Sequence, residues 1–400
     1  MRKTVSVALV GIGGYGGHYL GLVLDHGGTH GVKLVGVVDP WADRSPRLDD
    51  VRKRGAIICP DLDTFYRQAS ADLVVIASPI HLHCPQSLQA LPHGACVLCE
   101  KPLAGSFDDG KRMAEAAAAS KGFLAVGYQW SFSATIQQLK RDIMAGDFGC
   151  PVRLKTIGLW PRPHSYFTRN DWAGRQRSAD GRDVFDSPIN NATAHYLHNI
   201  FYVLGATREQ SAWPCAVEAE LYRANNIENF DTAVLRARTE QGAEVLYYAT
   251  HAVAWPLGPI IAYEFERAMV SYEHGIAPRF VARFKNGATR NYGDPNDQTS
   301  KLWECVEAVR TGAALACGAA AALPHALCVQ GAQTSMPEIA DFPPNMVGPH
   351  GDPDPVTCVG GLEAAIVQCY DQGILLSEHG GLDWSRKGQK VQLSRDGVGG

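Results

Sequence analysis

The stretch Val10-Gly-Ile-Gly-Gly-Tyr-Gly-Gly-His-Tyr19 decides the fold of the first part of the chain. It follows residues 4–10, a short apolar and β-branched run that is typical of a strand buried in a parallel sheet. Gly11, Gly13 and Gly16 have the spacing G-x-G-x-x-G. The first glycine permits a tight turn, the second lets the backbone approach a pyrophosphate, and the third lets the helix pack closely on the strand. We predict that this loop, with Ile12 and Tyr15, binds a dinucleotide at a helix N-terminus; a merely structural turn is the alternative.

A second apolar run, residues 33–38, ends in Asp39. An acid about twenty residues beyond a glycine loop of this kind binds the ribose hydroxyls of adenosine and repels a 2′-phosphate. Asp39 therefore favours NAD as the cofactor. Arg44 and Arg47 follow it closely and keep NADP as an alternative.

Strands and helices alternate along residues 1–127. Further strands are expected at residues 56–59, 72–77, 95–99 and 123–126, with helices at 46–55, 62–69, 85–94 and 106–121. Such βαβ alternation predicts an α/β fold, a Rossmann domain with a doubly wound parallel sheet.

Residues 128–400 follow a different pattern. Strands with one polar face are expected at 152–159, 216–223, 232–238, 245–249, 263–272 and 280–284, and helices at 135–145, 188–204, 302–310 and 361–372. The Pro/Gly-rich residues 342–356 are interpreted as a loop. We predict a second, α+β domain with a large, mostly antiparallel open sheet that packs on helices with one face and joins subunits of a homo-oligomer with the other.

The composition of the chain argues against some classes of partner and indicates the cellular compartment. The chain has 400 residues, 37 basic and 41 acidic side chains and a net charge of −4, which argues against nucleic acid or an anionic membrane as a partner. Its 11 cysteines are scattered through apolar segments and predict a reduced, cytoplasmic protein. Cys96 and Cys99 fit C-x-x-C, but two buried thiols are favoured over zinc or redox chemistry.

Polar residues follow two strands of the first domain. Ser78 and Pro79 come after the central strand, at the sheet edge where such folds bind ligands. His81 and His83 follow, and we favour helix capping or nucleotide contact over metal binding, because no cage of further ligands accompanies them. Glu100 and Lys101 follow the strand at residues 95–99. Lys101 is a candidate for proton transfer with a substrate hydroxyl, and a solvated surface lysine is the alternative.

The second domain offers a histidine on a helix. Ser187 is a suitable N-cap and Pro188 suits the first helical position, so a helix is expected to begin there. Asn191, His195 and His198 are spaced to share one face. His195 is the candidate acid/base, and a satisfied core histidine is the alternative.

The aromatic loop, residues 160–174, is rich in aromatic rings, arginines and amides. Sugars present apolar faces that stack on aromatic rings and hydroxyl pairs that bind polar side chains. We favour a polyol pocket over a structural loop; its candidate residues are Arg162, Tyr166, Arg169, Asn170 and Trp172.

Together these elements resemble the glucose–fructose oxidoreductase / inositol dehydrogenase (Gfo/Idh/MocA) family over nearly the whole chain. The resemblance rests on the glycine loop, Asp39-Pro40, Ser78-Pro79 with His83, Cys99-Glu-Lys-Pro-Leu103, Val126-Gly-Tyr128, the His195 helix and residues 302–323. It implies that Lys101 and His195 flank a substrate beside the nicotinamide, with Tyr128 and Trp130 at the domain crossover. Many members carry Asp-x-Gly-x-His-x-x-Asp on that helix. This chain has Asn191, Thr193 and His198 at the three positions beside the histidine, and Asp186 is a candidate to replace the missing carboxylate.

The sequence therefore predicts an NAD-dependent dehydrogenase of sugars or polyols, with a small carbohydrate as its partner. Two rivals remain open. One is a glycosidase that works by transient oxidation of the sugar, and the other is a nucleotide-binding protein without turnover.

Overall fold

The computed structural model describes residues 3–273, 275 and 277–399. The chain divides into two compact units: residues 1–104, 108–132 and 297–323 form the first, and residues 105–107, 133–296 and 324–400 form the second. Residues 297–323, which the sequence assigned to the second domain, thus belong to the first unit. No helix in the described part of the chain is long and apolar enough to cross a membrane.

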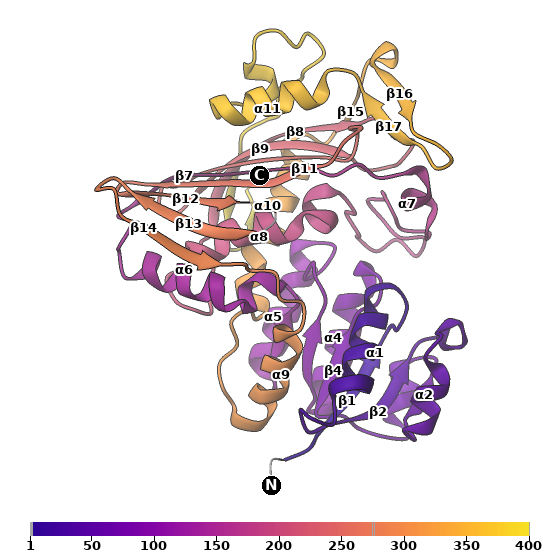
Figure 1. Ribbon diagram of the computed structural model, residues 1–400. Helices are drawn as coiled ribbons and strands as arrows, with labels where there is room; N and C mark the ends of the chain where they lie inside the picture. Colours follow the sequence, from indigo (N-terminus) through magenta and orange to yellow (C-terminus); the bar gives the residue numbers. More distant parts are fainter. Residues whose placement is uncertain (1–2, 274, 276, 400) are drawn as a thin grey trace. The chain divides into compact units, whose positions relative to one another are not determined.

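The first unit is built on a six-stranded sheet in the order β3-β2-β1-β4-β5-β6, as Figure 1 shows in part. Every pairing along it is parallel, which confirms the predicted doubly wound sheet. The strands are β1 (Val5–Val10), β2 (Val32–Val38), β3 (Ile57–Cys59), β4 (Leu73–Ile76), β5 (Cys96–Cys99) and β6 (Leu124–Val126). The helices are α1 (Gly14–His26), α2 (Leu48–Lys53), α3 (Leu62–Tyr66), α4 (His83–Ala90), α5 (Phe107–Ala119) and α9 (Ser300–Thr311).

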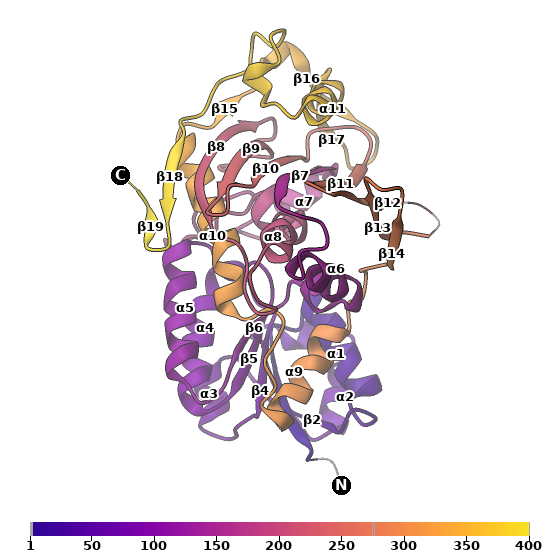
Figure 2. The same cartoon turned by 90° about the vertical axis from the view of Figure 1, so that its left-hand side faces the viewer.

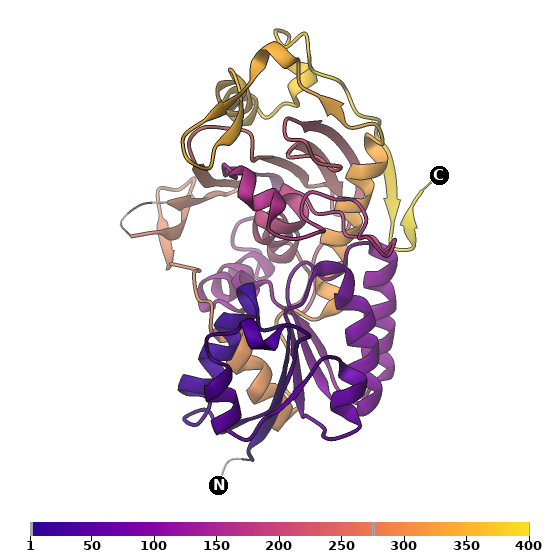
Figure 3. The same ribbon diagram turned by 90° about the vertical axis from the view of Figure 1, so that its right-hand side faces the viewer.

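Helix α9 belongs to the first unit although it comes late in the sequence, and this position has a physical reason. Right-handed crossovers place α1 and α2 on one face of the sheet and α3, α4 and α5 on the other, as Figures 2 and 3 show. No crossover helix then covers β4 and β5 on the face of α1. Helix α9 contacts β1, β4 and β5 there, so it completes the apolar layer that the first third of the chain leaves open.

The second unit contains an 11-stranded sheet whose main path runs β14-β13-β12-β11-β7-β10-β9-β8-β18-β19. Its pairings are antiparallel except β7 with β10 and β15 with β8, which confirms the mostly antiparallel prediction. The strands are β7 (Pro151–Leu159), β8 (Pro214–Arg223), β9 (Thr232–Thr239), β10 (Glu244–Thr250), β11 (Leu257–Phe265), β12 (Ala268–Glu273), β13 (Arg279–Phe284), β14 (Thr289–Gly293), β15 (Ala340–Asp341), β18 (Val391–Ser394) and β19 (Gly397–Val398). The helices are α6 (Ala134–Met144), α7 (His164–Thr168), α8 (Ala194–Val203), α10 (Ala319–Ser335), which begins in the first unit, and α11 (Leu362–Gln372).

Three expectations for this unit are wrong in detail. Residues 263–272 are not one strand, because the chain turns at Glu266 and Arg267 between β11 and β12. The loop expected at 342–356 contains β16 (Val347–His350), which pairs with β17 (Val356–Val359). The helix expected at 188–204 begins as a π-helix, Pro188–Ala192, before α8.

Both faces of the large sheet carry helices. Helix α8 contacts β7 on one face, and α11 contacts β7 and β10 on the other (Figure 1). Residues 362–387, the C-terminal strap, cover the second face through polar contacts. Arg236 makes two 2.7 Å bonds to Glu378, and the Ser377 hydroxyl donates to Glu220 at 2.5 Å. Part of this face stays exposed on β11 and β12, where Ile260 and Met269 are 38% and 39% exposed.

Candidate functional site

The glycine loop between β1 and α1 has the shape that its spacing predicts. Gly11 has φ +77°, and a Cβ on it would lie 2.9 Å from the Ser78 nitrogen. A Cβ on Gly16 would lie only 1.9 Å from the Gly11 carbonyl oxygen, so helix and strand touch at this point. A Cβ on Gly13 would meet nothing within 4 Å. Gly11 and Gly16 are therefore required by packing, while Gly13 borders open space.

The N-terminus of α1 is a suitable anion site. Its N-cap is Gly13, and no side chain caps it. The amides of the first turn and the positive end of the helix dipole favour an anion there. This uncapped end beside the open position at Gly13 fits the diphosphate of NAD.

Asp39, at the end of β2, holds the loop in place. Its two carboxylate oxygens accept hydrogen bonds of 2.8 Å from the amides of Ile12 and Trp41. The two arginines that could have bound the 2′-phosphate of NADP have other partners. Arg47 pairs with Asp25 and Asp50, and Arg44 lies 4.3 Å over the Trp41 ring.

His83 links two turns at the carboxyl edge of the sheet. Its ring is buried, with Nδ1 2.8 Å from the Pro102 carbonyl oxygen and Nε2 3.0 Å from that of Ser78. Burial lowers the pKa of His83, although both carbonyls work against this shift. The histidine thus ties the Ser78-Pro79 turn to the turn that carries Lys101. The described residues contain no group of His, Cys, Asp or Glu suited to a metal ion.

Glu100 is engaged inside the first unit. Its Oε1 accepts from Tyr19 at 2.6 Å and from Lys301 of α9 at 2.5 Å, and its Oε2 accepts from the Lys101 amide at 3.1 Å. Burial acts to raise the pKa of Glu100, but Lys301 and Tyr19 outweigh it and hold the pKa below its usual value. Lys301 also lies 4.4 Å over the ring of Tyr15 in the glycine loop. Sequence reasoning missed Lys301, because a lysine on an amphipathic helix normally points to water.

Lys101 follows Glu100 after the end of β5, as predicted, at the sheet edge that also holds Ser78 and the glycine loop. Tyr128 and Trp130 belong to the same unit and are buried, with 0% and 2% exposure. The proton-transfer role of Lys101 and the substrate contacts of the two aromatic residues stay predictions.

In the second unit, Asp186 supports the segment before α8. Its carboxylate accepts from the Asn191 side-chain amide and from the Gly174 amide, both at 2.7 Å. Ser187 caps the π-helix by accepting from the Asn190 amide, which confirms the predicted N-cap. The aspartate thus holds the side chain of Asn191 in place.

His195 and His198 differ in their surroundings. His195 is half-buried in the first turn of α8. His198 is 1% exposed and stacks on Tyr202 at 5.6 Å, and burial lowers its pKa well below the usual value. His198 is therefore packed as a core residue, and its predicted substrate contact gains no support from its position.

The aromatic loop after β7 is held by its own contacts. Asn170 accepts from the amides of Trp172 and Ala173 at 3.2 and 2.8 Å, so its side chain shapes the turn. Arg162 and Arg169 both lie against the ring of Tyr166.

His251 is a candidate that the sequence did not reveal. It follows β10, the parallel neighbour of β7, and its buried ring places Nδ1 2.7 Å from the Trp160 carbonyl oxygen. Burial, and then the charge of Arg162, lower the pKa of His251 to about 3, so the imidazole is neutral. No local sequence pattern points to this position, because it depends on the parallel pairing of β10 with β7, which are far apart in the chain.

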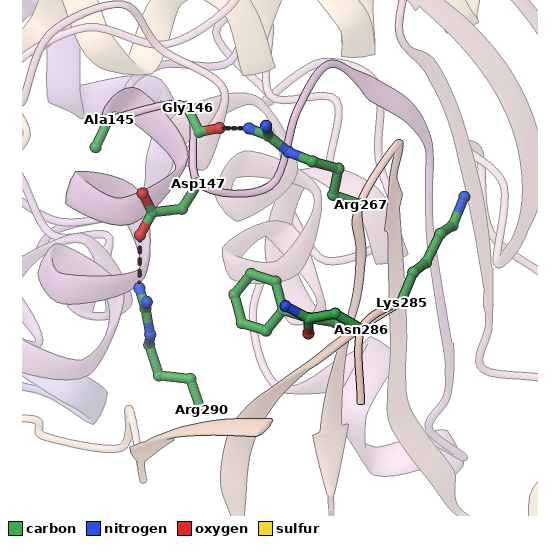
Figure 4. A pocket seen from close by; sticks show the side chains of 8 residues that line it. Ala145, Gly146, Asp147, Arg267, Lys285, Asn286 and Arg290 are labelled. Atoms are coloured by element: carbon green, nitrogen blue, oxygen red, sulfur yellow. Dashed lines mark hydrogen bonds and ion pairs between the residues drawn. The ribbon is translucent and has the colours of Figure 1, made fainter. Parts of the chain in front are cut away.

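A hollow of about 610 Å³ in the second unit contains none of these residues (Figure 4). Its arginines have partners: Arg267 donates to the Gly146 carbonyl, and Arg290 pairs with Asp147 and Asp142. We therefore assign no ligand to it.

Comparison with known proteins agrees with this geometry. Residues 5–128 match the Gfo/Idh/MocA model, described as "Oxidoreductase family, NAD-binding Rossmann fold". The chain is 27% identical to 2,7-anhydro-N-acetylneuraminate hydratase of Mediterraneibacter gnavus over 50% of this chain and 48% of the relative. It is 22% identical to inositol 2-dehydrogenase of Rhodococcus erythropolis over 78% of this chain and 86% of the relative. For the first curated relatives, the match spans about half of their length.

Solved structures share the fold over most of the chain. The WlbA dehydrogenase of Chromobacterium violaceum, in complex with NADH and UDP-GlcNAcA, superposes with a TM-score of 0.67 at 22% identity, over 84% of this chain and 95% of that one. Levoglucosan dehydrogenase in complex with NADH gives a TM-score of 0.67 at 16% identity, over 84% and 98%. With the glycine loop, Asp39 and the parallel sheet in place, residues 5–128 are similar to the NAD-binding Rossmann domain of the Gfo/Idh/MocA oxidoreductase family.

Proposed function

We propose that this protein is an NAD-dependent dehydrogenase that oxidises a ring hydroxyl of a sugar or polyol, or reduces the corresponding ketone. The observation that carries the proposal is the uncapped, open glycine loop at the same sheet edge as Lys101. Bound NAD supplies the acceptor for the hydride. The engagement of Arg47 by Asp25 and Asp50 favours NAD over NADP.

The residues of the chain position the substrate and move its proton. The glycine loop and Asp39 would hold NAD, which would take up the hydride, while the Lys101 amine accepts the hydroxyl proton and the carbonyl group forms. His195 of the second unit is the second group that we propose for proton transfer, and Asp186 holds the side chain of Asn191 in that unit. The aromatic loop covers the sugar ring.

The names of the relatives support the substrate class. Inositol 2-dehydrogenase acts on a polyol and levoglucosan dehydrogenase on a sugar derivative, by their names. Neither they nor the other relatives reported above are named glycosidases, so the rival hypothesis of sugar cleavage gains no support.

Location and assembly are part of the proposal. The eleven cysteines are free thiols in the structure, which supports the predicted cytoplasmic location. We propose a homo-oligomer, but the C-terminal strap covers the face of β8, β9 and β10. The part of the sheet left for an interface is therefore β11 and β12, with Ile260 and Met269.

The experiment is a thermal-shift titration with NAD and NADP, followed by a panel of sugars and polyols read by NADH absorbance. Lys101→Met should keep its affinity for NAD and lower turnover at least about a hundredfold, as expected for the loss of an acid/base group. Lys121→Met, at an exposed lysine, is the control. Unchanged turnover of Lys101→Met would remove this lysine from the mechanism.

A further inference from the structure

Two arginines share one tyrosine ring in the aromatic loop of the second unit. The guanidinium carbon of Arg169 lies 3.6 Å from the centroid of Tyr166, and that of Arg162 lies 5.0 Å from it. Trp160 and Trp172 flank the pair, at 5.7 Å from Arg162 and 5.3 Å from Arg169. Aromatic faces attract cations at these distances, so the rings hold two positive charges close together.

Neither arginine has a carboxylate partner within 4 Å among the described residues. Other arginines of this unit do: Arg223 pairs with Asp341, and Arg395 with Glu240. Asp186 is near enough to raise the pKa of Tyr166, after burial as the main cause. However, its oxygens already accept from Gly174 and Asn191. The two arginines of the loop thus lack the ion pairs that neutralise Arg223 and Arg395 in the same unit.

Arg162 also has an unsatisfied donor. Its Nε is buried and has no hydrogen-bond partner, whereas Arg169 donates to the Tyr166 carbonyl. A buried N–H without an acceptor is costly, and such groups in native proteins are usually satisfied by a ligand, ion or water. An acceptor delivered by a substrate would remove this cost.

His251 lies close enough to the same two arginines for their charges to act on it. His251 is buried and bonded to Trp160, and after burial the guanidinium groups of Arg162 and Arg169 lower its pKa. It is neutral, and with Nδ1 donating to the carbonyl its Nε2 is left as an acceptor. The wall of the loop therefore combines two cations, a neutral acceptor and aromatic faces.

We propose that the substrate of this protein is a sugar or polyol that carries an oxyanion, a carboxylate or a phosphate, and that Arg162 and Arg169 bind this group beside Tyr166. Guanidinium groups bind both oxyanions through paired N–H donors. The inference rests on the proposed dehydrogenase activity and narrows its substrate class. The oxidation step itself is unchanged, because the oxyanion takes no part in it.

The experiment compares matched compounds: glucose, glucuronate and glucose 6-phosphate, together with myo-inositol and an inositol monophosphate. Binding is measured by calorimetry in the presence of NAD, and turnover by NADH absorbance. We expect kcat/KM for an anionic member to exceed that of its neutral counterpart at least tenfold. Preference for glucuronate identifies a carboxylate as the group, and preference for the phosphorylated compounds identifies a phosphate.

Variants locate the effect. Arg162→Met and Arg169→Met should each lose at least tenfold in affinity for the anionic compound, mainly through KM, and keep their kcat and melting temperature. Arg162→Lys should recover part of the affinity. Arg175→Met removes an exposed arginine close by in the chain and should behave like the parent protein.

The two proposals fail in different ways. Oxidation of neutral and anionic compounds with equal efficiency, or equal losses for both in the two methionine variants, overturns the inference and leaves the dehydrogenase activity standing. Binding of an anionic sugar through Arg162 and Arg169 without any NADH formation overturns the activity and keeps the anion site. The absence of anion-dependent binding across the panel overturns the inference.

Discussion

Asp39 holds the glycine loop in place, and we propose that it also binds the ribose of the cofactor. Its carboxylate holds the amides of Ile12 and Trp41, and each oxygen keeps a further lone pair for a ribose hydroxyl. Removing the side chain should therefore loosen the loop and delete a cofactor contact together.

Asp39→Ala should weaken NAD binding by about tenfold to a hundredfold, the value of a hydrogen bond to a charged group, and should weaken NADP binding less. The reason is that the 2′-phosphate of NADP no longer meets a negative charge. Fluorescence titration with both cofactors measures the two affinities, and Asp39→Asn is the matched variant that keeps one acceptor oxygen. Equal losses for the two cofactors would refute the ribose role.

Lys301 and Glu100 form a buried ion pair across 201 residues of sequence. Their exposed fractions are 1% and 9%, so removing one partner leaves a charge without compensation. Lys301→Met should lower the free energy of unfolding by about 3–5 kcal/mol, as found when a buried pair is broken. Urea denaturation measures this loss, and the double variant Glu100→Gln/Lys301→Met should recover part of it. A loss of unfolding free energy below about 1 kcal/mol would show that these two charges do not stabilise the fold as a buried ion pair.

At the scale of elements, the turn from β1 into α1 contains one glycine that is required by packing, Gly16, and one that borders open space, Gly13. The Cβ of an alanine would collide with the Gly11 carbonyl at position 16 but would meet nothing within 4 Å at position 13. Gly13 has φ −79° and ψ 169°, which an alanine also adopts without strain.

Gly16→Ala should therefore destabilise the protein by separating α1 from β1. Gly13→Ala should keep the melting temperature of the protein without cofactor and lose NAD binding, because its methyl group takes the space where the diphosphate approaches. Thermal melting with and without NAD checks both variants. NAD binding by Gly13→Ala at parent affinity would argue against a diphosphate at this position.

Elements with strong local signals could be predicted from the sequence, and the others could not. The first sheet and the cap at Ser187 follow from apolar runs and a capping residue. The β11–β12 turn falls on Glu266 and Arg267, which carry no glycine or proline signal. The π-helix depends on a bond from the Thr193 amide to the Pro188 carbonyl, a choice that 3.6-residue periodicity does not encode.

The candidate site shows the same division. Motif spacing was enough to locate the glycine loop, Asp39 and Lys101. The partners of Glu100 and the position of His251 depend on chain segments far apart in sequence, and local patterns contain no information on them.

At the scale of the molecule, the C-terminal strap makes stability depend on pH. Glu220 is buried under it, and burial raises its pKa from 4.5 to about 7, although bonds from Ser377 oppose the shift. The folded protein therefore binds a proton that the unfolded chain releases between these values. This contribution to stability is fully present below about pH 4.5 and is lost as the pH rises to about 7.

Glu220→Gln should remove this dependence, which amounts to roughly 3 kcal/mol between the two pH values. Urea denaturation at about pH 5 and at about pH 8 compares the variant with the parent protein. Glu363→Gln, at an exposed glutamate of the same strap, is the matched control. An equal pH slope in Glu220→Gln and the parent protein would remove Glu220 from this effect.

The late position of α9 in the chain also governs how the protein is made. A ribosome releases the strands of the first sheet well before residues 300–311 emerge, so β4 and β5 stay bare on one side during most of translation. The nascent cofactor-binding half therefore exposes an apolar surface until synthesis has passed these residues. A fragment ending near residue 132 should precipitate or recruit chaperones, and its solubility should be restored when a separate peptide covering residues 297–323 is supplied.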